Sequence, residues 1–458
     1  MRTNQSEHIF LSKKWEYLSY IISFAVAMGL ARMEYSVLAG VVLMGEGIYL
    51  YVMNFQRTKC FVDIRGLFSL SWVSGIGLTC LKLSQLQQNW KMMTWLCFFC
   101  AYGCFMVGYD FYEMKQAKKR VNCSTTKECN LVKEDAYANR IFHCILALSI
   151  ASVVCFLVEA MVVGFIPLFS PEPHAYSYFH VSGVHYFTIS CILNPALTVL
   201  YIKSKEKIEA NLIPFLIGAN VIAVAIPILC VSRFQLLFAV GFAAVTYLMV
   251  YRKITWKMII IAICIMIPAY VLLSVARRHD VTYLNGIFEM KNVNMPIFVT
   301  QPYMYVANNF ENFNCLVEQL PKHTMGLRMF FPVLALTGLK FLLPQLVSFP
   351  NYITKKELTT LTMFYDSYYD FGIIGVILLA LILGIVAAWI TTWIRRSKNP
   401  MSYLFYGQIA IYMGLAFFTT WFSNPTTWFW LVITGMFYVY VGFGNKKLKK
   451  KQNADGGN

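Results

Sequence analysis

The sequence predicts an all-α, polytopic integral membrane protein. Of its 458 residues, 58% are hydrophobic and only 13% are charged, which is more apolar surface than one soluble core can bury. Runs of about 20 mostly apolar residues recur along the whole chain, and each is long enough to cross the hydrocarbon layer of a bilayer as a helix. We therefore interpret residues 1–458 as a single transmembrane domain.

Twelve spans account for these runs. The predicted spans are Tyr17–Ala31, Val37–Met53, Leu67–Leu83, Met92–Phe111, Ile141–Val163, Val181–Ile202, Ile208–Cys230, Phe234–Tyr251, Met258–Val275, Phe371–Ile394, Leu404–Trp421 and Trp428–Phe443.

The placement of Lys and Arg predicts the orientation of these spans. Short connectors rich in Lys and Arg belong in the cytoplasm. With both termini cytoplasmic, twelve spans put every such connector inside, including Tyr112–Arg140 and the basic tail Asn445–Asn458. Because this placement accounts for the formal net charge of +17, we expect no nucleic-acid partner, and the membrane lipid is the surrounding medium.

The long segment Ala276–Asp370 then lies outside the cell membrane. Within it, Phe330–Leu346 is apolar, but two prolines, a glycine and Lys340 interrupt the run. Counting this run as a span would invert the last three helices and place the lysine-rich tail outside. We therefore predict a large extracytoplasmic loop that contains a re-entrant or interfacial segment.

Arginines at the outer ends of two spans are candidate phosphate ligands. Arg233 opens the eighth span, where an arginine costs a few kcal/mol unless it is paired or hydrated. Arg277 and Arg278 leave the ninth span on the same side. Guanidinium groups bind phosphate oxygens in a bidentate manner. The alternatives are a snorkelling Arg233 and a long loop that escapes the charge bias.

Histidines in the outer segments are candidates for acid–base chemistry or sugar binding. His323 precedes the interrupted apolar run, together with Arg328, and histidine is a suitable general base near neutral pH. The alternative is an ordinary surface histidine. His180 and His185 are candidates for hydrogen bonds to sugar hydroxyls. Their spacing with His174 is irregular and carboxylates are few nearby, so we predict no metal site.

Tyrosines and carboxylates crowd the start of the tenth span, and we predict a saccharide-binding surface there. Rings that stack on sugar faces, with carboxylates that bind hydroxyls, are typical of such surfaces. The alternative is an interfacial belt of tyrosines. Asp370 fits that alternative least well because it lies directly at the membrane border. The residues concerned are Tyr365, Asp366, Tyr369 and Asp370.

Taken together, the chain resembles the O-antigen and capsule oligosaccharide repeat-unit polymerases, the Wzy-like polytopic polymerases. The resemblance covers most of the chain in order, and the combination of features with twelve spans is more specific than any single motif. The features are Gly164-Phe165-Ile166-Pro167-Leu168-Phe169 after the fifth span, Ser232-Arg233 at an outer helix end, the long outer loop, and the run from Asn351 and Thr354 to Tyr369-Asp370-Phe371-Gly372-Ile373-Ile374-Gly375.

The resemblance implies a GT-C-like glycosyltransferase in the bacterial cytoplasmic membrane, multi-pass and with its active site facing outside. Such an enzyme transfers a growing glycan from undecaprenyl diphosphate to a hydroxyl of the next undecaprenyl-diphosphate-linked oligosaccharide, without a metal or another cofactor. A chain-length regulator and a flippase are partners that the resemblance suggests. The sequence agrees in one respect, because it has neither a Gly-rich phosphate loop nor an Asp-x-Asp motif.

The resemblance also implies roles for individual residues. Arg328 would serve either lipid-linked partner, and the residue types leave the choice of general base open between two candidates. By position, the diphosphate would be held by Arg233 and by Arg277 or Arg278, and the base would be His323 or Asp370.

Two rival functions remain. The first is an O-antigen-type ligase, which moves finished glycan to another acceptor. The second is a flippase or transporter of lipid-linked oligosaccharide. A flippase should line a central cavity with charges from several spans, whereas the predicted spans hold Glu46, Glu159 and little else. The length of the outer loop also exceeds what a transporter needs.

Overall fold

The computed structural model describes residues 2–121, 134–171, 175–254, 256, 260, 263–264, 281–346 and 348–455. These residues form helices and connecting segments without any strand, and a single bridge joins Ser84 to Met290. Eight of the described helices are long and apolar enough to cross a membrane. The chain is therefore an all-α, multi-pass membrane protein, as the sequence predicts.

The eight spanning helices coincide with eight of the twelve predicted spans. Among the other four, Tyr17–Ala31 lies within α1 (Arg2–Arg32), and Leu404–Trp421 begins with α17 (Met401–Gly414). Most of Met258–Val275 lies outside the described residues. The total of twelve spans and their orientation stay predictions. The spanning helices are Ser36–Thr58, Met92–Ala117, Asp135–Val163, Val184–Ser204, Ala210–Leu229, Arg233–Tyr251, Tyr365–Ile394 and Pro425–Phe443.

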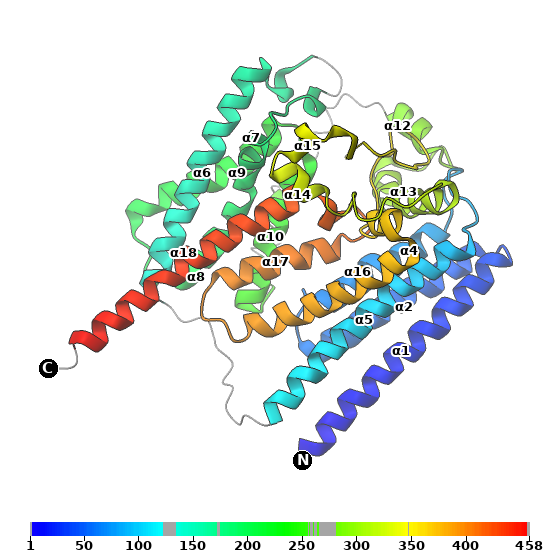
Figure 1. The fold of residues 1–458 in the computed structure, drawn as a ribbon, viewed down its shortest axis with the longest axis horizontal. Helices are drawn as coiled ribbons and strands as arrows, with labels where there is room; N and C mark the ends of the chain where they lie inside the picture. Colours follow the sequence, from blue (N-terminus) through cyan, green and yellow to red (C-terminus); the bar gives the residue numbers. More distant parts are fainter. Residues whose placement is uncertain are drawn as a thin grey trace. The chain divides into compact units, whose positions relative to one another are not determined.

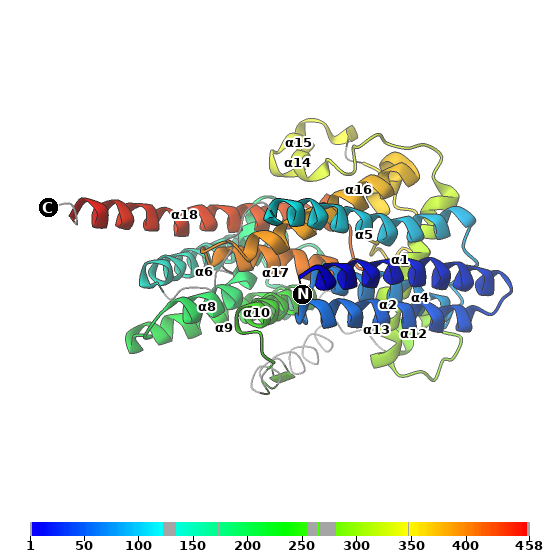
Figure 2. The same cartoon turned by 90° about the horizontal axis from the view of Figure 1, so that it is seen from below.

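The helices belong to two compact units, which are drawn in Figures 1 and 2. Both units combine segments that are distant in the sequence. The first unit consists of Met1–Ser124, Asp280–Trp389 and Tyr412–Pro425, and the second consists of Thr125–His279, Ile390–Ile411 and Thr426–Asn458.

In the first unit, the N-terminal helices run side by side (Figure 1). The remainder of this unit comes mainly from the segment predicted to lie outside. Its helices are α1, α2 (Ser36–Thr58), α3 (Ile64–Phe68), η1 (Ser69–Val73), α4 (Ser74–Cys80), α5 (Met92–Val121), α12 (Val281–Phe288), α13 (Ile297–Gln319), α14 (Phe331–Leu336), α15 (Leu339–Leu342), η6 (Pro344–Leu346), α16 (Tyr365–Ile394) and η7 (Trp421–Ser423).

The predicted third span is built from α3, the π-helical turn η1 and α4, held tightly against α2. Small residues bring the two backbones into contact. A Cβ added at Gly77 would lie 2.7 Å from the carbonyl oxygen of Gly40, and one added at Gly47 would lie 2.2 Å from Ser74 Oγ. Ser69 Oγ also donates to the carbonyl oxygen of Gly47, at 3.2 Å. These contacts explain why a segment of modest hydropathy packs as a helix.

The segment predicted as an outer loop contains regular structure that the sequence analysis did not predict. Its main element is α13, a helix of 23 residues. The Trp72 ring is buried between three aromatic rings that tie η1 to other elements: its centroid lies 5.8 Å from Phe98 of α5, 5.2 Å from Phe310 of α13 and 4.9 Å from Phe364. This aromatic cluster fixes α13 on the helices of the first unit. Phe330–Leu346 forms three short helices and no spanning helix.

The second unit is a bundle in which α6, α8, α9 and α10 pack against one another (Figure 2). Pro195 and Pro214 lie in the first turns of α8 and α9, where the missing N–H is not needed. Trp430 of α18 packs on Phe238 and Phe242 of α10. The helices are α6 (Asp135–Val163), η2 (Pro167–Phe169), η3 (Ala175–Ser177), α7 (Val184–Thr188), η4 (Ile189–Leu193), α8 (Asn194–Ser204), η5 (Ala210–Leu212), α9 (Ile213–Leu229), α10 (Arg233–Tyr251) and most of α17 (Met401–Gly414) and α18 (Pro425–Asp455).

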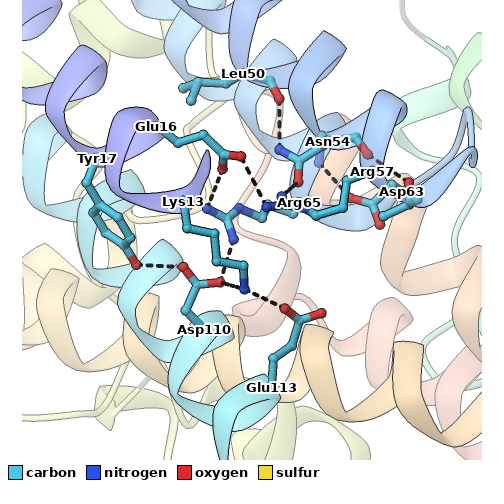
Figure 3. A network of polar contacts seen from close by, with 12 residues as sticks. Lys13, Glu16, Tyr17, Leu50, Asn54, Arg57, Asp63, Arg65, Asp110 and Glu113 are labelled. Carbon is cyan, nitrogen blue, oxygen red and sulfur yellow. Dashed lines mark hydrogen bonds and ion pairs between the residues drawn. The ribbon is translucent and has the colours of Figure 1, made fainter. Parts of the chain in front are cut away.

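A buried ionic network joins four helices of the first unit at the ends predicted to be cytoplasmic (Figure 3). Arg65 of α3 lies at its centre and is 1% exposed. Its guanidinium donates to Glu16 Oε2 of α1 at 2.8 Å and to Asp110 Oδ1 of α5 at 2.5 Å. Arg57 of α2 pairs with the other Glu16 oxygen at 3.1 Å, and Lys13 lies 2.7 Å from Asp110.

The network balances its charges. Lys13 also binds Glu113 at 2.7 Å, so three cations face three carboxylates. Asp110 lies inside the predicted fourth span, and the count of charges in the spans did not include it. Because a charge in a low-dielectric region is tolerated only when it is paired and hydrogen-bonded, this network explains how α1, α2, α3 and α5 can share polar groups at the membrane border.

Replacing Arg65 by Met should cost about 3–5 kcal/mol of stability, because Glu16 and Asp110 would each lose a buried partner. Thermal unfolding of the purified protein in detergent measures this loss. The matched control is Arg57→Met, because the Arg57 side chain is 20% exposed and binds only the edge of the network. Equal unfolding temperatures for Arg65→Met and the unaltered protein would contradict this account.

Candidate functional site

Six of the predicted site residues come together in the first unit, where the connector after α13 meets the first turns of α16. We call this group the Arg328 cluster. It consists of His323, Arg328, Tyr365, Asp366, Tyr369 and Asp370, with Asn351 as an additional member.

Asp370 holds the connector in place. Its side chain is 0% exposed, and its carboxylate accepts hydrogen bonds from the backbone N–H of Arg328 at 3.2 Å, from that of Met329 at 2.8 Å and from the Thr324 hydroxyl. The backbone N–H of Met325 also donates to the Asp370 carbonyl oxygen. The carboxylate is thus an anchor for residues 324–329, and its engaged oxygens make it poorly placed to act as the predicted general base.

Gly372 makes this arrangement possible. Its φ of +59° and ψ of −147° interrupt the helical path of α16 just after Asp370, in a region of backbone space that favours glycine. A Cβ at this position would also lie 3.1 Å from His323 Nε2. The Gly372 that contributes to the family resemblance therefore has a physical reason, because it makes room for the imidazole.

His323 is held in one tautomer by the backbone. Its Nδ1 lies 3.2 Å from the carbonyl oxygen of Tyr369, which can only accept, so Nδ1 carries the hydrogen and Nε2 carries the lone pair of the neutral ring. Nε2 forms no hydrogen bond with the described part of the chain. The ring is partly exposed and packs at 5.9 Å, edge to face, on Tyr368. This is the arrangement that a general base requires.

The Arg328 guanidinium is bonded on several sides and keeps an N–H donor for a ligand. Its Nε donates to Asp366 Oδ1 at 2.6 Å, and its terminal nitrogens donate to Asn351 Oδ1 at 2.8 Å and to the Pro350 carbonyl oxygen at 3.3 Å. The guanidinium lies 4.4 Å from the centroid of the Tyr369 ring. A guanidinium has five N–H donors. Three bind these oxygen atoms and the Tyr369 hydroxyl also interacts with the group, so within the described part of the chain one donor is left for a ligand.

The predicted saccharide-stacking tyrosines face inward in this structure. The rings of Tyr365 and Tyr369 are buried and pack against Arg328, so neither presents an open face. The Tyr365 hydroxyl donates to the Tyr352 carbonyl oxygen at 3.0 Å and accepts from the Tyr352 N–H at 2.8 Å. Their role here is to hold the guanidinium by cation–π contact.

Two predicted histidines lie together in the second unit. Nδ1 of His185 lies 3.1 and 3.2 Å from the two carboxylate oxygens of Glu159, a fully buried residue of α6. The backbone N–H of Val181 donates to the same carboxylate at 3.0 Å, and the His180 ring lies 5.2 Å from His185. Glu159 therefore orients the His185 imidazole, and it is no isolated membrane charge.

Of the remaining predicted arginines, the structure describes Arg233 alone. Arg233 begins α10 directly after the turn from α9, and it is partly exposed. That turn packs through Val231 against Leu168 and Tyr176 of the connector after α6. Arg277 and Arg278 lie outside the described residues, as does His174.

The sequence analysis missed the asparagines of α13. Asn312 Nδ2 donates to the carbonyl oxygens of Leu358 and Thr360 at 2.8 and 2.9 Å, and its Oδ1 accepts from the Thr354 N–H at 2.8 Å. These bonds position the segment that supplies Asn351 to Arg328. The available signal was the run Asn308-Asn309-Phe310-Glu311-Asn312-Phe313-Asn314, whose polar residues are all buried.

Among the residues that the structure describes, no group of three or more His, Cys, Asp or Glu is placed to hold a metal ion. Comparisons with protein-family models, with curated proteins and with solved structures found no match to this chain. The site is therefore interpreted from its own residues.

Replacing Asp370 by Ala should release the connector, because two backbone N–H groups lose their acceptor and each such loss costs about 1–3 kcal/mol. We expect hydrogen exchange of the Arg328 and Met329 amides to become about tenfold faster or more. The control is Asp366→Ala, which removes the ion pair to Arg328 and leaves both amides bonded to Asp370. Unchanged exchange in Asp370→Ala would show that the carboxylate is no anchor.

Proposed function

We propose that the chain is a polymerase that joins undecaprenyl-diphosphate-linked oligosaccharide repeat units into a surface polysaccharide of the O-antigen or capsule type. In this proposal it crosses the bacterial cytoplasmic membrane twelve times, with both termini inside, and acts on the outer face. The observation that carries the proposal is the Arg328 cluster, in which an oriented imidazole and an arginine with one N–H donor left for a ligand meet at the start of a membrane span.

In the proposed reaction, His323 Nε2 takes the proton of an acceptor sugar hydroxyl. The acceptor oxygen forms the new bond to the anomeric carbon of the donor sugar, while the bond from that carbon to the diphosphate oxygen breaks. The lipid diphosphate leaves with the electron pair. Arginine donors stabilise the charge on this leaving group. Within the first unit, Arg328 is proposed to bind one of the two lipid-linked partners. The prediction that Arg233 binds a diphosphate concerns a residue of the second unit and is tested separately.

The apolar segment beside Arg328 supports a substrate that carries a lipid. Phe330, Phe341 and Leu342 are 64%, 65% and 75% exposed, which would be costly in water but suits contact with lipid. Phe371 and Ile374, on either side of the helix interruption at Gly372, are also exposed. A substrate whose diphosphate lies at the membrane surface would then reach Arg328 without leaving the bilayer.

The buried charges of the ionic network around Arg65 do not favour the rival hypothesis of a transporter. A solute path needs polar groups that can exchange partners with the solute. The central arginine of the ionic network, Arg65, is almost fully buried and bonded to two carboxylates. We therefore keep the flippase and the ligase as outcomes of the test below.

Replacing His323 by Ala should lower polymer formation by about a hundredfold or more, because the acceptor hydroxyl loses its base. The assay mixes the purified protein with a lipid-diphosphate-linked repeat unit and follows glycan length. His143→Ala is the control, since His143 lies in the other unit and contacts Tyr440.

Three results would count against the polymerase proposal. Undiminished polymer formation by His323→Ala removes His323 as the base. Transport of the labelled lipid without polymer favours a flippase. In a deletion strain, loss of all attached glycan favours a ligase, whereas retention of a single repeat unit supports a polymerase.

Replacing Arg233 by Ala should reduce polymer formation about ten- to a hundredfold, which corresponds to the loss of one charge-assisted hydrogen-bond pair. Arg233→Lys should keep part of the activity because it keeps the charge but loses the bidentate geometry. Arg140→Ala is the matched control, because Arg140 binds the Tyr440 carbonyl oxygen at the other end of the second unit's helices. Normal glycan length at normal protein level in Arg233→Ala would identify Arg233 as a snorkelling residue.

A further inference from the structure

A small cavity with several polar groups in its wall lies in the first unit, at the ends of α1, α4 and α5 that are predicted to be outside. Its volume is about 190 Å³, which is the size of a single sugar ring. Glu311 of α13 lines it from within, and the connector between α4 and α5 forms much of its wall. The lining includes the charged, amide and indole side chains of Arg32, Lys82, Gln88, Asn89, Trp90 and Glu311, together with the hydroxyls of Ser36 and Thr79.

Glu311 is the buried acid of this cavity. It is 2% exposed. Trp90 Nε1 donates to its Oε1 at 2.8 Å, and the Gln88 N–H lies 3.4 Å from Oε2. Burial raises the pKa of the Glu311 carboxyl to about 8, against the opposing effects of Trp90, the Gln88 amide and Lys82. At neutral pH the carboxyl is therefore mostly protonated and contributes little negative charge.

Two cations then dominate the charge of the cavity. Lys82 donates to Asn89 Oδ1, and Arg32 donates to the Met92 sulfur at 3.0 Å. Neither forms an ion pair with a carboxylate in the part of the chain that the structure describes. Arg32 is exposed and Lys82 is partly exposed, and Glu34 acts on Lys82 only through a longer-range charge interaction. Two cations that lack an ion-paired carboxylate favour an anionic ligand.

The remaining wall suits a saccharide. Gln88 and Asn89 are exposed amides that can donate to and accept from hydroxyls. The partly exposed indole of Trp90 adds an aromatic surface, and its N–H is already fixed by Glu311. A small cavity that combines amides, an indole and two cations has the groups needed for a sugar ring that bears a carboxylate.

We propose that this cavity binds one acidic monosaccharide unit, with the sugar carboxylate between Arg32 and Lys82 and the ring against Trp90. The inference rests on the proposed function only in assigning that unit to the lipid-linked oligosaccharide. It goes further by naming a sugar class that the Arg328 cluster does not specify.

The experiment is saturation-transfer NMR titration of the purified full-length protein with glucuronate, glucose and acetate. Glucuronate should bind at least tenfold more tightly than either of the others, because only it carries both the ring and the carboxylate. Lys82→Gln should weaken glucuronate binding about tenfold or more, as expected for a lost charge-assisted contact. Lys340→Gln, on the exposed apolar segment, should leave it unchanged.

A second variant tests the role of Glu311. Ionisation of Glu311 places a negative charge beside the sugar carboxylate, so binding should weaken as the pH rises through about 8. Glu311→Gln keeps an acceptor for Trp90 and should remove this dependence. The titratable and charged groups that face Glu311 are Cys80 at the end of α4, Lys82 after it, Arg32 at the end of α1, and Tyr303, Cys315 and Glu318 on α13.

Each alternative result overturns the proposal. If acetate binds as tightly as glucuronate, the cavity is a general anion site. If glucose binds as tightly, Arg32 and Lys82 do not contribute to sugar recognition. If glucuronate does not bind, the cavity is not a sugar site. Lys82 has a φ of +48°, so if Lys82→Gln fails to fold, the pH profile of Glu311→Gln decides. Because binding is measured without turnover, the result is separable from polymer formation, and either can fail while the other stands.

Discussion

The Asp370 carboxylate is the constraint on which the candidate site depends. It lies just before the helix interruption at Gly372, and it draws the backbone of Arg328 and Met329 onto the first turns of α16. The same contact brings His323 to the Tyr369 carbonyl oxygen. Asp370, which was predicted as a possible base, is therefore better described as the anchor that positions His323, the other candidate base. The acid holds the backbone, and the imidazole keeps a free nitrogen.

The asparagines of α13 extend this constraint to the rest of the outer segment. A buried amide is stable only when both its donors and its acceptor are used, and Asn312 satisfies this by binding three backbone groups of residues 354–360. Asn309 does the same for a second connector, because its Nδ2 donates to the Phe417 carbonyl oxygen at 2.8 Å. The surroundings of Arg328 are thus built by a helix whose own side chains never touch the guanidinium.

The sequence predicted the membrane class and eight of the spanning helices because a span is a local property, readable from an apolar run. It also selected Asp370, since a carboxylate at a membrane border is unusual, and it selected His323, Arg328 and Asp366 from the chemistry of their side chains. It did not find α13, because buried amides look like loop residues until their partners are known. The sequence likewise did not predict the pairing of Glu159 with His185, because it does not show which residues are partners. The two residues are far apart in the sequence, and only the packing of α6 with α7 brings them together.

Function is best sought where polar groups are left incompletely satisfied. In the ionic network around Arg65, by contrast, the charges are paired: three cations face three carboxylates across four helices. Exposing any one of these groups would break its bonds to at least one other. Such a network stabilises a single arrangement. Among the described residues, Arg328 instead has one carboxylate partner and an N–H donor left for a ligand, and Nε2 of His323 has no hydrogen-bond partner. The contrast between a closed network and an open cluster, within one unit, is the physical reason to place chemistry at Arg328 and structure at Arg65.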